Sequence, residues 1–416
     1  MPMTRSWVAS ANDPACDFPL ANLPCGVFSV DDGPALCGVA IGDRILELAG
    51  LEASGLLDLG EGGLFVVPYW NEFMELGPTM WNRLRERLTV LLAEGAAERE
   101  QVEPHLVAVA DAVMHLPIAV SEYTDFYAGR YHATNVGTMF RGAENALPPN
   151  WLHIPIGYNG RASTVVVSGT DVVRPMGQLK APDADVPTFA ACRRLDIELE
   201  LGAVVGGSTE MGTRLSVAEA DAMIFGYVLL NDWSARDIQA WEYQPLGPFQ
   251  AKAFATTISP WIVTAAALEP FRVATPPREV PLLPYLEEPG PGLFDIAVSA
   301  SIRPEGAERE TTICETNYRE MYYSAAQQLA HHASSGCAMN AGDLLGSGTI
   351  SGPGVRERGS LLEVTWGGKE PLALEGGGTR TFLEDGDTVT LRGAALGDGY
   401  RIGFGACVGR ILPARP

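Results

Sequence analysis

The chain of 416 residues is short of cations. It holds 29 lysines and arginines against 51 aspartates and glutamates, which gives a formal charge of -22 at pH 7. Only three of the cations are lysines, namely Lys180, Lys252 and Lys369. So acidic a protein repels polyanions, and we expect neither nucleic acid nor an anionic membrane as a partner. An acidic ligand would need the few cations gathered at one place.

Long apolar runs and ordered cysteine spacings are also missing. No run approaches the ~20 apolar residues that a membrane-spanning helix needs. The first residues show no apolar core behind a basic start, so we expect a cytoplasmic protein without a signal peptide. The seven cysteines are scattered without C-x-x-C spacing. They are therefore expected to be reduced, packed thiols rather than a zinc site or a disulfide framework.

Glycine and proline, in contrast, are abundant, at 46 and 30 residues, which favours short strands joined by turns. Between residues 18 and 48, apolar runs alternate with turn signals and predict a small β-barrel-like unit. Residues 78–94 change to helical spacing and predict a helix packed on that barrel. Residues 106–120 are expected to form a linker strand. We place the boundary near residue 118, which gives a structural or interfacial domain 1–118 and a second domain 119–416.

The second domain is expected to be mainly β. Val165–Val167 is predicted to be a buried strand, and residues 225–232 a second one that ends in Asp232. A helix is predicted from Asn317 to His332. The C-terminal residues alternate short apolar runs with Gly or Asp turns and should complete an all-β core.

Polar chemistry is concentrated in residues 125–141, DFYAGRYHATNVGTMFR. His132 has an unperturbed pKa near neutrality and is a natural proton acceptor, Asp125 could hold a metal, and Arg141 could clamp an anion. Small residues between them leave room for a ligand. Taken alone, the segment is better interpreted as a polar loop with a surface histidine, so the case depends on residues further along the chain.

An acidic strand is predicted from Leu195 to Gly206. Its leucines point to one face, while Asp196, Glu198 and Glu200 point to the other. Carboxylates two residues apart repel one another unless water or a cation intervenes. The segment alone is thus either the solvated face of an edge strand or half of a site for a hard cation such as Ca²⁺ or Mg²⁺.

Further polar residues follow the strand that ends in Asp232. Arg236, Gln239 and Tyr243 come at spacings of four, three and four, on one side of a helical turn. The alternative is an exposed helix face with an internal ion pair. Lys252 lies in an apolar segment otherwise free of charge, either as a selected point charge or by chance.

Several long segments carry a resemblance to a known family: DFYAGRYHATNVGTMFR, GRASTVVVSGT, LDIELE, NDWSARDIQAWEYQPLGPF and GDLLGSGTISGP. From DFPLANLPCGVFS to GDGYRIGFGACVGRILPA they span nearly the whole chain, which is identified as a member of the fumarylacetoacetate hydrolase family. The resemblance implies a mainly β fold with some helix, made of a small SH3-like barrel and a larger mixed β-sandwich roll, and a homodimer. It also implies hydrolysis of the C–C bond of 4-fumarylacetoacetate to fumarate and acetoacetate, the last step of tyrosine and phenylalanine catabolism, by metal-assisted water attack with a histidine base.

The resemblance also implies two metal sites. Four carboxylates would hold Ca²⁺: Asp125, Glu198, Glu200 and Asp232. Three residues would hold Mg²⁺: Asp232, Lys252 through its backbone carbonyl, and Thr256.

The resemblance further implies the catalytic and substrate-binding residues. His132 would be the general base, oriented by Glu363. Three side chains would lie near the developing negative charge: Arg236, Gln239 and Lys252. Six residues would contact the substrate: Tyr127, Arg141, Tyr158, Gln239, Tyr243 and Thr349.

Three positions depart from the expected pattern. Tyr131 stands where a second histidine usually precedes the base, Asn159 stands where YHGRAS is usual, and Ala253 replaces a glycine. None of them removes a proposed ligand, but they leave the shape of the pocket open.

Two kinds of alternative function remain. One is a related acylpyruvate or diketo-acid hydrolase, a decarboxylase or an isomerase, although such relatives usually lack the long N-terminal domain and the YHATNVG segment. The other is a non-catalytic Ca²⁺-binding β-module, which leaves His132, Arg141 and Lys252 unexplained.

Overall fold

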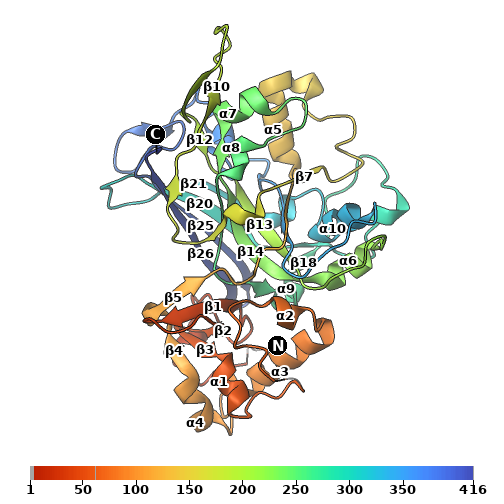
Figure 1. Cartoon of the computed structure of the whole chain (residues 1–416), viewed down its shortest axis with the longest axis vertical. Coiled ribbons are helices and arrows are strands. Elements are labelled where there is room, and N and C mark those ends of the chain that lie inside the picture. Colours follow the sequence, from red (N-terminus) through yellow and green to blue (C-terminus); the bar gives the residue numbers. More distant parts are fainter. Residues whose placement is uncertain (1–3, 61, 416) are drawn as a thin grey trace.

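The N-terminal body is built on a five-stranded antiparallel sheet, drawn in red and orange at the bottom of Figure 1. The computed structural model describes residues 4–60 and 62–415. The strands are, in spatial order, β4 (Leu106–Ala108), β3 (Arg44–Glu47), β2 (Leu36–Ile41), β1 (Cys25–Val30) and β5 (Ala112–His115). The three central strands match the predicted barrel-like unit. The expected linker strand is wrong, because residues 106–115 instead supply β4 and β5, which pair with β3 and β1 at the edges of this sheet.

Four helices accompany this sheet: α1 (Leu48–Ala53), α2 (Asn71–Met74), α3 (Pro78–Leu92) and α4 (Arg99–Val102). The longest, α3, confirms the helix expected from the spacing of its leucines. It opens with Pro78, whose missing N–H costs nothing in the first turn of a helix. Leu84, Leu88 and Leu91 are buried on the side that faces the N-terminal core.

The larger body is organised around an eight-stranded mixed sheet. Its main path runs β7 (Gly157–Asn159), β6 (Tyr123–Phe126), β22 (Leu344–Gly346), β13 (Leu199–Val205), β14 (Ile224–Asp232), β16 (Thr256–Ile258) and β8 (Val165–Val167). A further strand, β17 (Val263–Thr264), pairs with β14. The β6–β22 and β8–β16 pairs are parallel and the other pairs are antiparallel. All residues of β13 and β14 are buried, as in a sheet covered on both faces.

A second sheet of five strands packs on the first. Its order is β21 (Thr311–Asn317), β20 (Ala297–Arg303), β25 (Thr388–Gly397), β26 (Tyr400–Leu412) and β9 (Val172–Val173). One apolar core joins both sheets, since it includes Leu229 of β14 together with Leu391 of β25 and Phe404 of β26. The chain is therefore mainly β with a sandwich of two mixed sheets in its larger part, as predicted.

Short elements surround this sandwich. Four strand pairs complete it: β10 (Met176–Leu179) with β11 (Thr188–Ala191), β12 (Leu195–Asp196) with β15 (Ser234–Ala235), β18 (Arg272–Val273) with β19 (Leu293–Phe294), and β23 (Leu372–Ala373) with β24 (Thr379–Arg380). The helices are α5 (Arg130–Arg141), α6 (Val217–Met223), α7 (Arg236–Glu242), α8 (Gln250–Ala253), α9 (Ala265–Leu268), α10 (Ala325–Ala333) and α11 (Leu361–Val364). No helix within the described residues is long and apolar enough to cross a bilayer.

The helix predicted from Asn317 to His332 is wrong at its start. α10 begins only at Ala325, because Ser324 and Gln327 form a capping box that satisfies the first free amides. Tyr322 and Tyr323, which precede it, are buried in the core and pack edge to face. The aromatic pair therefore extended the apparent helical pattern beyond the real helix.

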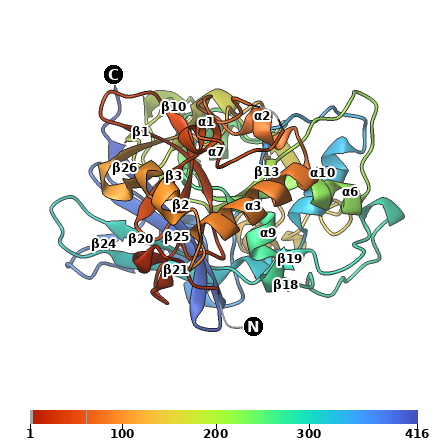
Figure 2. The ribbon, with the colours of Figure 1, turned by 90° about the horizontal axis from the view of Figure 1, so that it is seen from below.

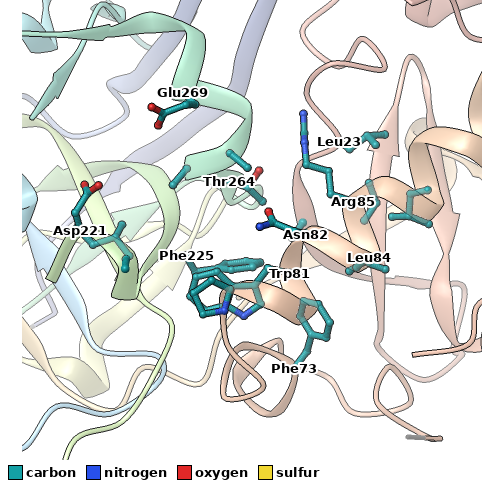
Figure 3. Close-up of a pocket in the computed structure, with 18 of the residues that line it drawn as sticks. Leu23, Phe73, Trp81, Asn82, Leu84, Arg85, Asp221, Phe225, Thr264 and Glu269 are labelled. Carbon is teal, nitrogen blue, oxygen red and sulfur yellow. The ribbon is translucent and has the colours of Figure 1, made fainter. Parts of the chain in front are cut away.

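The two bodies meet along α3, which lies beside α9 in Figure 2, and residues of both helices line one cavity. Trp81 of α3 packs edge to face on Phe225 of β14, with ring centroids 5.1 Å apart. Cys25 and Ile262 exchange two backbone hydrogen bonds across the same junction. A cavity of about 240 Å³ lies here. Figure 3 shows that apolar side chains such as Trp81 and Phe225 line it together with polar ones, among them Arg85 and Glu269. The N-terminal body thus contacts the strand that carries Asp232 at its far end.

Candidate active site

Four carboxylates converge where neighbouring strands of the large sheet end. Asp125 lies on β6, Glu198 in the link before β13, Glu200 on β13, and Asp232 is the last residue of β14. One oxygen from each lies within 4.8 Å of the others, and all four residues are buried. The interpretation of the acidic strand as a solvated edge is therefore wrong, because β13 lies between β22 and β14 inside the sheet.

This cluster fits a hard cation. Asp125 Oδ1 and Glu200 Oε1 are buried without a hydrogen-bond partner in the part of the chain that the structure describes. Burial, followed by repulsion from Asp232, raises the pKa of Asp125 well above its ordinary value, and burial followed by repulsion from Asp125 does the same for Glu200. Oxygen ligands of this kind suit Ca²⁺ or Mg²⁺, which would supply the missing partner and compensate the negative charge.

Two buried cations face the other side of the cluster. Lys252, on α8, donates from Nζ to Glu198 Oε2 and to Asp232 Oδ2, each at 2.5 Å. Arg236, the first residue of α7, places Nη2 2.8 Å from Glu198 Oε1. Burial raises the pKa of the Glu198 carboxyl, but Lys252 and Arg236 outweigh it and hold that pKa at about 2. Glu198 is therefore ionised, and two of the chain's cations lie together at this place.

His132 is held beside the cluster by a buried carboxylate. It lies in the first turn of α5, and its Nδ1 is 2.6 Å from Glu363 Oε2. Its Nε2 is 3.7 Å from Glu198 Oε1. α5 can begin here because Gly129 lets the backbone pass Thr349, whose carbonyl oxygen would lie only 2.3 Å from a Cβ at that position.

Glu363 is surrounded by donors. Asn135 Nδ2 donates to Oε1 at 2.9 Å, Ser360 Oγ donates to Oε2 at 2.9 Å, and Ser351 Oγ lies 3.0 Å from both oxygens. Burial opposes ionisation of Glu363, but His132 and these donors hold its pKa below the ordinary value. A carboxylate so fixed orients the imidazole with Nδ1 occupied and Nε2 free.

The sequence-based interpretation missed these three donors. Asn135 lies one helical turn after His132 and so shares its side of α5, a spacing that could have revealed it. Ser351 and Ser360 come from the loop before α11 and are brought to Glu363 only by the fold.

Four further predicted residues lie close to these groups. The Tyr127 ring stands edge to face with His132, with centroids 5.5 Å apart. Thr349 is buried, and its hydroxyl has no partner among the described residues. Tyr158 donates its hydroxyl to Asp125 Oδ2 at 2.7 Å and also contacts Asp232 Oδ2 at 3.0 Å. Thr256 Oγ1 lies 3.4 Å from Asp232 Oδ1.

Three predicted substrate contacts lie further out. Gln239 accepts from Arg236 Nη1 at 3.2 Å, one step removed from the carboxylates. Arg141 is exposed, and its guanidinium donates to the backbone carbonyls of Asn145 and Ala146 at 3.1 and 2.7 Å. Tyr243 follows α7 and is 38% exposed. These side chains border the site rather than its buried centre.

Comparison with known proteins identifies the family. The model for "Fumarylacetoacetate (FAA) hydrolase C-terminal" matches residues 122–411, and "Fumarylacetoacetase N-terminal" matches residues 21–117. Fumarylacetoacetase of Bos taurus is 49% identical, over 98% of this chain and 99% of the relative. That of Caenorhabditis elegans is 50% identical, over 96% and 97%.

Solved structures agree on the fold. A fumarylacetoacetate hydrolase from psychrophilic Exiguobacterium antarcticum superposes with a TM-score of 0.54 at 17% identity, covering 94% of this chain and 100% of that one. A maleylpyruvate hydrolase from Sphingobium gives a TM-score of 0.51 at 15% identity, with the same coverage. Such low identities speak only for the fold. The near-complete matches at about half identity go further, and the chain belongs to the fumarylacetoacetate hydrolase family.

Proposed function

We propose that this protein hydrolyses the C–C bond of 4-fumarylacetoacetate to fumarate and acetoacetate, the last step of tyrosine and phenylalanine catabolism. One observation carries the proposal. An imidazole with Nδ1 engaged by a buried carboxylate presents Nε2 to a buried carboxylate cluster at 3.7 Å. The identity of the substrate is inferred from relatives that are named fumarylacetoacetase and share about half of their residues with this chain.

In this reaction His132 acts as the general base. Because Glu363 occupies Nδ1, the lone pair of the neutral ring lies on Nε2, on the side of the carboxylate cluster. Nε2 takes a proton from the water, whose oxygen bonds to the ketone carbon next to the fumaryl group. The C–C bond on the other side of that carbon then breaks, its electron pair leaves as the acetoacetate enolate, and a proton added to the enolate carbon gives acetoacetate. Glu363 then stabilises the imidazolium that forms, as an ionised partner close to the proton on Nδ1.

The carboxylate cluster would hold Ca²⁺, and Mg²⁺ would be held by Asp232, the Lys252 carbonyl and Thr256. A divalent cation held there would supply positive charge to stabilise the negative charge that develops on the diketone oxygens. The orphan oxygens of Asp125 and Glu200 support this assignment, since a buried carboxylate oxygen without a partner is costly.

The remaining side chains bind and orient the substrate. Lys252 and Arg236 place donors next to the carboxylates, where negative charge builds up, and Gln239, which accepts from Arg236, would donate its amide group to the substrate. Arg141 clamps a terminal carboxylate of the substrate, since two carbonyls hold its guanidinium and three of its five donors stay available. Further substrate contacts would come from the side chains of Tyr127, Tyr158, Tyr243 and Thr349.

We also propose that the chain acts as a homodimer in the cytoplasm and divides into domains 1–118 and 119–416. The two family models, which end at residue 117 and begin at residue 122, support this division. Light scattering after gel filtration tests the dimer, and a monomeric mass would reject it.

A turnover assay tests the function. The purified protein is given fumarylacetoacetate and, in parallel, an acylpyruvate of similar length, and loss of diketone absorbance is followed. We expect efficient turnover of fumarylacetoacetate and a much lower kcat/KM for the acylpyruvate. The opposite preference would favour a related diketo-acid hydrolase. Calcium binding without any turnover would favour a non-catalytic module.

A further inference from the structure

Asp196 is a buried carboxylate surrounded by four donors. Its side chain is fully enclosed. Oδ1 accepts from the backbone amides of Ile197 and Leu361, each at 2.8 Å. Oδ2 accepts from the Leu362 amide at 3.0 Å and from Arg236 Nε at 2.8 Å. The sequence placed this residue on the same face as two cluster acids, but the structure turns it to a different set of partners.

These donors belong to the two elements that carry the halves of the site. The two leucine amides open α11, whose third residue is Glu363, the partner of His132. Arg236 opens α7 and pairs with Glu198 of the cluster. Asp196 also lies on β12, which pairs with β15 directly before α7. Asp196 therefore joins the two halves of the site: the base side, with His132 and Glu363, and the metal side, with the carboxylate cluster.

Followed from group to group, the contacts form a closed ring. His132 Nδ1 meets Glu363 at 2.6 Å, α11 is held by Asp196, Asp196 holds Arg236, and Arg236 lies 2.8 Å from Glu198 Oε1. Glu198 Oε1 in turn faces His132 Nε2 at 3.7 Å. The distance between Glu198 Oε1 and His132 Nε2 is the one that matters to a base acting beside a cation site. Two series of contacts set this distance, one through α11 and one through Arg236, and both end at the Asp196 carboxylate.

We infer that Asp196 is a positioning residue, which fixes the separation between the base and the carboxylate cluster by tying α11 to Arg236. The reaction in which this is measured rests on the proposed function. The requirement is strict because a displacement of about 1 Å in a catalytic constellation costs on the order of 10²-fold in rate. A carboxylate is needed because all four groups around it are donors, and only an ionised acid accepts from every direction.

Asp196→Asn is the direct test. The amide keeps the size of the side chain but turns an NH₂ group toward donors, either at α11 or at Arg236. We expect kcat to fall by about 10–100-fold, the usual cost of losing a group that orients a ligand or base. KM should change by less than about threefold, because the fully buried Asp196 side chain is occupied by its four donors and does not contact the substrate.

Asp387→Asn is a matched control. Asp387 is also fully buried, and it accepts from Arg380 Nε and Nη2 at 2.9 and 3.0 Å and from the Glu384 amide at 2.8 Å. None of these partners belongs to the site. It should lose a similar amount of thermal stability and retain kcat within about twofold of wild type. Equal losses of kcat in both variants would overturn the inference, since the effect would then be general destabilisation.

A double-mutant cycle separates positioning from an independent role. Combining Asp196→Asn with Glu363→Gln should cost clearly less in kcat than the product of the single losses, because both changes damage the same ring. Multiplicative losses would reject the ring. If Asp196→Asn does not fold, Asp196→Ser replaces it, since the smaller side chain admits water to the freed donors. Failure of both variants to fold would assign Asp196 to folding and reject the inference.

A second readout does not depend on the reaction. Calorimetric titration with Ca²⁺ alone should give an affinity about tenfold weaker for Asp196→Asn than for wild type, because Arg236, freed from Asp196, competes more strongly for Glu198. Asp387→Asn should bind Ca²⁺ like wild type. If wild type binds Ca²⁺ but does not turn over fumarylacetoacetate, the proposed function fails while this readout still tests Asp196. Unchanged Ca²⁺ affinity together with unchanged kcat in Asp196→Asn would overturn the inference.

Discussion

Glu363 and the pair formed by Asp125 and Glu200 are equally buried acids in one site, yet their surroundings are opposite. Donors engage both oxygens of Glu363, and His132 and those donors hold its pKa below the ordinary value. Asp125 and Glu200 each keep an orphan oxygen among the described residues, and burial raises their pKa values. The protein thus completes the base side by itself and leaves the other side to be completed by a cation.

The largest expected effect comes from removing His132 on the base side of the site. His132→Ala should lower kcat toward the upper end of the range of about 10²–10⁴ that general-base catalysis supplies. Binding of substrate or product should survive, because the cations and the carboxylate cluster remain. Steady-state kinetics and equilibrium binding of fumarate measure the two effects. His153→Ala, at an exposed histidine, is the control, and near-normal turnover by His132→Ala would reject the assigned base.

The next largest effect is expected from removing the cation that the carboxylate cluster would hold on the metal side of the site. Chelation should lower turnover by on the order of 10²-fold, since a metal supplies several kcal/mol of charge stabilisation. Adding Ca²⁺ or Mg²⁺ should restore it, and the melting temperature should rise with cation concentration because the ligand binds only the folded state. Activity assays and thermal melts after exhaustive chelation check this. Full activity in a metal-stripped sample would contradict the assignment of the cluster.

The smallest effect is a difference in pH dependence between the two sides. In metal-free protein, the raised pKa values of Asp125 and Glu200 mean that the folded state retains protons that the unfolded chain releases above about pH 4. The free energy of unfolding should therefore fall as the pH rises from about 5 to about 8. Glu198 has the opposite shift, to about 2, so its contribution is lost only in acid.

Thermal melts at about pH 5 and about pH 8 measure the slope of the free energy of unfolding against pH. Saturating Ca²⁺ should remove it, because the cation replaces the retained protons, and Asp125→Asn should reduce it in metal-free protein. Equal melting temperatures at both pH values in metal-free protein would show that the folded state does not retain protons on Asp125 and Glu200.

Local pattern was enough for several elements of the fold. Turn signals predicted the central strands of the N-terminal sheet, leucine spacing predicted α3, and the apolar run before Asp232 predicted the strand that presents it. Each of these depends on contacts within a few residues or on the face of one element. α10 was predicted to begin too early because buried tyrosines continue the apolar pattern of a helix, and only the capping box fixes its start.

The site was less accessible from the sequence itself. Family resemblance, rather than spacing, supplied the set of four acids and the partner of the base. His132 and Glu363 are 231 positions apart, and no local pattern connects them. Strand alternation put Asp196 with Glu198 and Glu200, but the break between β12 and β13 gives it other partners. Alternation predicts a face only while the strand is continuous.

The sequence by itself determined which groups are available: an acid-rich chain with few cations, a histidine among small residues, and strands whose ends carry carboxylates. Their electrostatic state was decided only by the tertiary structure. Burial between two sheets makes a charged carboxylate without a partner costly, whereas a carboxylate that is paired with donors keeps its charge. The distances that decide whether a carboxylate is paired are set between chain segments hundreds of residues apart.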